Sequence, residues 1–193
     1  NIDQESFTSG STLTTNTGSI DITAVNTATI DAVSVAASVA AGYASSGSAL
    51  ALSGGGADAR NLIQGKTNSF ATNSTLTSAD AVSVTTTSTT SVGARVIAAS
   101  ASLAIATTKS AGSASVGASR ATNSIGSASD KPAEARAYLE NTSVSAAGAL
   151  TVAATTDQTI DASVSALSAA ISIGKGAMGL SGAGAETINT IKV

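Results

Sequence analysis

The chain has 193 residues, and four small residue types, Ala (41), Ser (32), Thr (27) and Gly (18), account for 118 of them. It contains no His and no Cys, which excludes an imidazole base, a thiolate nucleophile, disulfides and the usual zinc site. A net charge of −3 with a single Pro is unlike a disordered chain, and nine Lys and Arg against twelve Asp and Glu leave no basic surface for nucleic acid.

The chain starts at Asn1 rather than Met, from which we expect a processed product or a segment of a longer protein. A secretory signal is not recognisable. No stretch of about 18 residues is free of polar groups, because even the Ala-rich run 32–52 is interrupted by Ser and Gly. The sequence therefore predicts no membrane span.

Three copies of one pattern follow along the chain and predict a single domain over residues 1–193, with repeats at about 7–70, 71–136 and 137–193. The matching segments are residues 11–13, 18–22 and 29–32, then 74–76, 81–84 and 91–94, then 142–144, 149–152 and 159–162. The equivalent residues Ile30, Val92 and Ile160 are 62 and 68 residues apart. The six additional residues fall around Pro132, where we expect a surface insertion.

Alternation with a period of two predicts β-strands within each copy. Large apolar residues alternate with polar or small ones at Ile20 and Ile22, Val82 and Val84, and Leu150 and Val152. Because Ala is a strong helix former, a helix is the alternative for residues 31–52, 94–106 and 161–173. Interleaved Ser, Thr and Val, without a helix-capping pattern, favour strands.

These features predict an all-β fold, a parallel β-solenoid (β-helix) built from three repeats of about 62–68 residues. A repeat of that length is expected to hold about three rungs of roughly 20 residues. Inner faces of Ala, Ser and Gly would let the sheets approach closely. Each copy closes with Asn-x-Ile, so we expect Asn61, Asn123 and Asn189 to stack as structural residues at one corner of the repeat.

One family likeness rests on residues 135–144 (ARAYLENTSV), 147–154 (AGALTVAA) and 160–162 (IDA), followed by a Gly/Ala tract and Asn189-x-Ile191. This pattern resembles the repeats of giant secreted bacterial surface proteins of the filamentous-haemagglutinin-like type. The resemblance implies a parallel β-helix shaft, export across the outer membrane and a place on the cell surface or in an extracellular fibre. The chain departs from the family pattern at residues 65–71, where an Ala-Tyr-Ile-like strand is usual.

Carboxylates are the only acid/base candidates, and a polysaccharide-active β-helix enzyme is one alternative function. Such an enzyme needs two or three carboxylates converging in a groove. Asp31 and Asp161 occupy equivalent positions, but Gly93 replaces them in the middle copy. We therefore expect solvated surface carboxylates and no catalytic, cofactor-binding or metal-binding residues.

Two glycine-rich segments match known loops only in part. Residues 54–58 (GGGAD) depart from the calcium-binding nonapeptide at its fourth position and do not recur, whereas calcium rolls need tandem copies. Residues 174–179 lack the Gly-Lys-Ser/Thr ending of a phosphate loop. Both segments are expected to be loops without a ligand.

A surface module that binds ice or glycans is the other alternative. Thr85, Thr87 and Thr89 alternate as in flat Thr arrays that bind ice, but the equivalent stretches at 23–27 and 153–157 break the array. Stacking against a glycan would depend on the aromatic residues, which are Phe7, Tyr43, Phe70 and Tyr138. The segments 73–75 (NST) and 141–143 (NTS) also match the N-glycosylation pattern at equivalent repeat positions.

The sequence as a whole predicts a non-enzymatic structural protein, the shaft or building block of an extracellular bacterial adhesin or fibre. Its uncapped coils would associate end to end with neighbouring repeats or with a second copy. A host or cell-surface glycan or protein is a further expected partner. Nucleic acid, a membrane span and cofactors are not expected.

Overall fold

The computed structural model describes residues 2–126 and 133–192, and all twelve secondary-structure elements in these ranges are β-strands. The first coil contains β1 (Ile2–Ser9), β2 (Thr12–Thr15), β3 (Ile20–Ala44) and β4 (Ala49–Ile63). The second contains β5 (Gly65–Thr72), β6 (Thr75–Ser78), β7 (Val82–Ala106) and β8 (Ala111–Ile125). The third contains β9 (Ala133–Glu140), β10 (Ser143–Ala146), β11 (Leu150–Ile173) and β12 (Ala177–Ile191).

Equivalent strands of the three coils form four parallel sheets, β1-β5-β9, β2-β6-β10, β3-β7-β11 and β4-β8-β12. The register follows the sequence repeat, since Ile30 pairs with Val92 and Val92 with Ile160. The predicted parallel β-solenoid is therefore confirmed, and the Ala-rich runs are strands rather than helices. The insertion expected around Pro132 lies at residues 127–132, outside the described residues.

Each repeat makes a single coil, so the expected division into three rungs of roughly 20 residues is wrong. β3 continues for 25 residues and β4 for 15. The alternation of inward and outward side chains is not interrupted until the chain bends at residues 45–47. Residues 54–58, expected as a loop, lie in the middle of β4.

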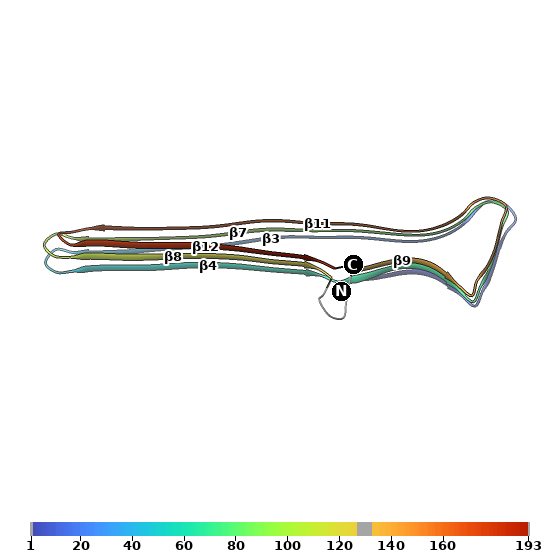
Figure 1. Cartoon of the computed structure of the whole chain (residues 1–193), viewed down its shortest axis with the longest axis horizontal. Coiled ribbons are helices and arrows are strands. Elements are labelled where there is room, and N and C mark those ends of the chain that lie inside the picture. Colours follow the sequence, from blue (N-terminus) through green and yellow to red (C-terminus); the bar gives the residue numbers. More distant parts are fainter. Residues whose placement is uncertain (1, 127–132, 193) are drawn as a thin grey trace.

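The coil is long and flat over most of its length, and it widens at one end (Figure 1). In the flat part the layers of β3 and β4 run side by side, whereas β1, β2 and the start of β3 enclose the wider end. The wide end is filled by large aliphatic side chains, which are Ile20, Ile22, Leu76, Val82 and Val84. In the flat part the buried clusters consist mostly of Ala.

Two glycines show how closely the layers of the flat part approach each other. A Cβ atom at Gly55 would lie 2.7 Å from the carbonyl oxygen of Ala99, and one at Gly117 would lie 2.7 Å from that of Leu167. Between the same layers the buried hydroxyls of Ser100 and Ser115 hydrogen-bond at 2.7 Å. The small inner residues thus permit a layer spacing that larger side chains would prevent.

Candidate functional surfaces

The three repeat-closing asparagines stack inside the solenoid. The Asn61 side-chain amide donates to the Asn123 carbonyl oxygen at 2.8 Å, and Asn123 donates to Asn189 at 2.9 Å. Asn123 is fully buried. The residues lie within β4, β8 and β12, two positions before each strand ends, rather than in a turn at a corner. The stack is a structural ladder that ties the coils together.

A corner of the coil is instead formed by Gly10, Asn73 and Asn141, all of which have positive φ angles of 48–58°. The next residue in each coil is Ser or Thr, and its hydroxyl donates to the carbonyl oxygen two residues back, as Ser74 does to Thr72 at 2.8 Å. Asn tolerates this left-handed conformation better than most residues. The recurrence of Asn-Ser/Thr at residues 73 and 141 therefore has a structural explanation.

Asp31 and Asp161 lie on one row of the outer face of the β3-β7-β11 sheet, with Gly93 between them. The Asp31 carboxylate lies over Gly93, where a Cβ atom would be 2.5 Å from its Oδ1 atom. Together with Arg95 they line a shallow, open depression. The two carboxylates share an exposed face, and no group of three His, Cys, Asp or Glu side chains able to hold a metal occurs in residues 2–126 and 133–192.

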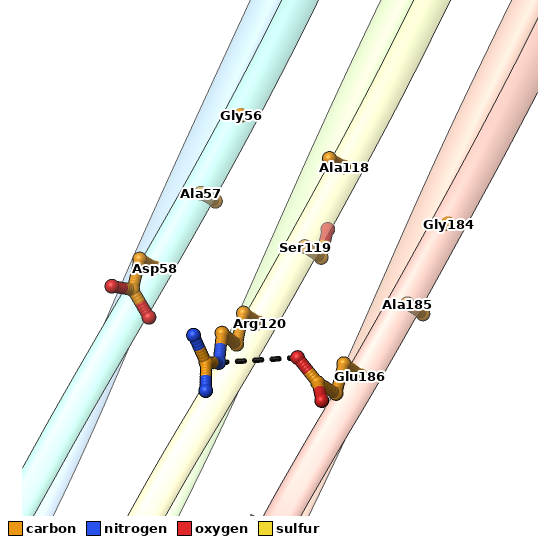
Figure 2. A pocket seen from close by; sticks show the side chains of 9 residues that line it. All are labelled: Gly56, Ala57, Asp58, Ala118, Ser119, Arg120, Gly184, Ala185 and Glu186. Carbon is orange, nitrogen blue, oxygen red and sulfur yellow. Dashed lines mark ion pairs between the residues drawn. The ribbon is translucent and has the colours of Figure 1, made fainter.

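A second depression, of about 540 Å³, crosses the outer face of the β4-β8-β12 sheet. Its floor is made of Gly56, Ala118 and Gly184, whose small side chains leave a trough across the three coils (Figure 2). Its charged border contains Asp58, Arg120 and Glu186, and Arg120 pairs with Glu186 at 3.1 Å. The internal repeats of the sequence did not reveal this row, because its members are 62 and 66 residues apart and differ in charge.

Three of the four aromatic residues form one ladder on the wide end. The Phe7 and Phe70 ring centroids are 5.1 Å apart, those of Phe70 and Tyr138 are 5.0 Å apart, and the rings are within 7° of parallel. Segment 65–71, which departs from the family pattern, thus supplies the equivalent strand with Phe70 in the place of Tyr138. Because the rings cover one another, free ring faces remain at the two ends of this ladder.

The Thr array on the β3-β7-β11 sheet is more complete than the alignment of the three sequence repeats indicated. Ala24 and Asn26 face the interior, so the residues between them and on either side face outward. The outward rows are Thr23–Thr85–Ala153, Val25–Thr87–Thr155, Thr27–Thr89–Asp157 and Thr29–Ser91–Thr159. Thr23 and Thr85 share a hydroxyl hydrogen bond of 3.2 Å. Eight of these twelve positions are Thr, on one sheet face.

The first and third coils provide the edges of every sheet, with β7 and the other middle strands between them. Of the glycine-rich segment 174–179, residues 174–176 form the turn between β11 and β12 and residues 177–179 begin β12, so a strand rather than a helix follows the turn. Among the described residues, no helix has the length and apolar character needed to span a bilayer.

Comparison with known proteins gives no match for this chain among family models, curated proteins or solved structures.

Proposed function

We propose that this chain is a rod-forming segment of an extracellular bacterial adhesin or surface fibre, with a mechanical rather than a catalytic role. The observation that supports this proposal is the uninterrupted register of twelve parallel strands through three coils. Stacked coils with one cross-section make a stiff rod whose stability grows with each interface between neighbours. Carboxylates and hydroxyls spread over open outer faces, as at Asp31 and Asp161, fit the same role.

Extension of the rod would occur at the strand edges of the first and third coils. An edge strand presents backbone N–H and C=O groups that a further parallel strand can pair with. The partner is a neighbouring repeat or a second copy of the chain. The resemblance of residues 135–162 to repeats of filamentous-haemagglutinin-like proteins supports a place on the bacterial surface, and the absence of Cys from the chain agrees with it.

Electron cryo-microscopy of the purified chain over a concentration series tests the proposal. We expect filaments with a layer spacing of about 4.8 Å along their axis, the separation of paired strands. Hydrogen exchange provides an internal control, because assembly should newly protect amides of β3 and β11 but leave those of β7, which already pairs on both sides. Discrete particles at every concentration and salt level would contradict end-to-end growth.

The Thr-bearing face supports one second candidate, a surface module that binds ice. Its support is the set of outward Thr residues on adjacent rows of a flat sheet. Thermal hysteresis of the unmodified chain and of the Thr87→Lys variant would test this function, with Ala114→Lys on the other sheet as the control. Ice binding requires activity that Thr87→Lys removes and Ala114→Lys retains.

A further inference from the structure

The half of the β3-β7-β11 sheet that lies away from the wide end carries an uncharged outer surface, which we call the apolar face. It consists of the outward-facing residues of 35–43, 97–105 and 165–173, which are in register across the three coils. Fourteen of the fifteen residues are aliphatic or aromatic, and the exception is Ser165. Several are strongly exposed, including Val39 (82%), Tyr43 (71%) and Leu167 (68%).

This arrangement inverts the usual distribution of side-chain size. The interior beneath the apolar face holds Ala, Ser and Gly42, whereas the Val, Leu and Ile residues of these three segments point to solvent. Nine residues of strand by three strands give a face of roughly 30 by 14 Å, or about 420 Å². An exposed apolar patch of this size on a monomer commonly marks an interaction site.

We propose that the apolar face binds the apolar face of a second copy of this chain, forming a side-by-side dimer. Two flat sheets pack face to face through interdigitating apolar side chains at a spacing of about 10 Å. A two-fold interface requires a surface that is complementary to itself. Ala101 lies in the middle coil and the middle row of the face, with larger side chains such as Leu103 beside it. A two-fold axis that lies between the copies, parallel to both sheets and over Ala101, would bring the two faces into register.

Charge and composition favour a second copy over other occupants. Binding to anionic lipid requires a cationic border around the apolar surface. The border of this face instead carries both signs, because Lys109 and Lys175 lie in the turns beyond one end, while Asp31 and Asp161 share the other end with Arg95. The opposite sheet is less suited to the contact, because its outward positions include Gly54 and Gly56 and its apolar zone ends at the Asp58–Arg120–Glu186 row. Burial of about 840 Å² of sheet in total is below the standard interface size, so the dimer should be weak and reversible.

Site-specific cross-linking tests the geometry directly, because the chain has no Cys of its own. Ala101→Cys places one thiol at the centre of the apolar face, and Ala114→Cys places one on the opposite sheet of the same coil. With a bismaleimide that spans about 10 Å, we expect covalent dimers from Ala101→Cys and monomers from Ala114→Cys. Equal yields from the two variants would overturn the proposal.

Sedimentation velocity supplies the second measurement. The unmodified chain should show a monomer–dimer equilibrium, and Leu103→Lys should raise the dissociation constant about tenfold or more, because it buries an unpaired ammonium. Ala114→Lys is the matched control and should leave the constant within about twofold. A monomer at all concentrations, or a dimer unaffected by Leu103→Lys, would refute the apolar-face contact. End-to-end growth is distinguishable, because it gives an open series of sizes and uses strand edges that Leu103 does not touch.

Discussion

The guanidinium group of Arg120 in the middle coil lies 3.1 Å from the carboxylate of Glu186 in the third coil. In the first coil the same row holds Asp58, so a basic residue separates two acidic ones. The wide end repeats this order, with Lys66 between Asp3 and Glu134. The middle coil therefore separates acidic residues that would repel one another if they were on adjacent strands.

An in-register joint between two copies would remove this separation. The third coil of one copy would meet the first coil of the next, bringing together Glu186 with Asp58, Glu134 with Asp3, and Asp161 with Asp31. One opposite-charge pair, Arg136 with Glu5, would form. Three acidic pairs against one opposite-charge pair make this joint repulsive on balance, although Arg60 at 3.0 Å from Asp58 and Arg136 at 2.8 Å from Glu134 offset part of the repulsion. End-to-end growth of identical copies should therefore depend on salt.

We expect filament growth to be slow at low ionic strength and to increase as salt screens the acidic pairs. Asp58→Lys should promote growth at low salt, because Glu186 of the preceding copy would then face an ammonium group. Light scattering across a salt series measures both effects. Asp21→Lys is a control, since Asp21 is on the row of Thr151. Growth that falls as salt is added would contradict this account.

Asn123→Ala should reduce the free energy of unfolding by about 1–3 kcal/mol, because it removes both hydrogen bonds of the stack and leaves Asn61 and Asn189 without these partners. Urea denaturation measures this change. Asn61→Ala removes one of the two bonds but leaves the buried Asn123 carbonyl oxygen without this donor, and it should cost about 1 kcal/mol. Equal losses in the two variants would mean that the stack does not act as a ladder.

Gly117→Ala should destabilise the solenoid by about 1–3 kcal/mol, because the new methyl group would meet the carbonyl oxygen of Leu167. Gly182→Ala on the neighbouring strand is the control, since nothing lies within 4 Å of the added Cβ atom. That variant should be neutral or slightly more stable, because Ala restricts the unfolded chain. Thermal unfolding compares the stability of the two variants with that of the unmodified chain. An unchanged unfolding temperature for Gly117→Ala would refute the close approach of the layers.

Asn73→Val should lower stability by about 1–2 kcal/mol, because a β-branched residue resists the left-handed conformation of this corner. Asn73→Gly should be tolerated, as Gly10 occupies the same corner of the first coil. Denaturation midpoints compare the two variants. A larger loss for Gly than for Val would show that the Asn side chain, rather than the backbone angle, matters here.

The sequence repeat predicted much of this architecture. The alternation of Ile20 and Ile22 identified strands, and the spacing of Ile30, Val92 and Ile160 predicted the register correctly. Both features are local or periodic, so they can be read from one chain. The stack of Asn61, Asn123 and Asn189 follows from the same register.

The size of the coil and the surface rows required the folded structure. An alternating Ala/Ser/Gly run looks the same whether it bends or continues, so nothing local revealed that β3 has 25 residues. Gly55 lies in a strand because another layer approaches it, which is a tertiary effect. The order of Asp58, Arg120 and Glu186 becomes visible once strands from distant parts of the chain lie side by side.

The contacts of Gly55 and Gly117 also give the rod a direction. Each glycine belongs to one coil, while the carbonyl oxygen that it faces belongs to the following coil. The corresponding residue in the third coil is Ala183, whose methyl group points to where the next carbonyl would lie. The strand of an added coil that faces Ala183 would therefore meet a methyl group where Ala99 and Leu167 meet glycine. The two ends of the stack are structurally unequal, so a fibre of such rods would be polar and would hold each attached partner in one orientation along its axis.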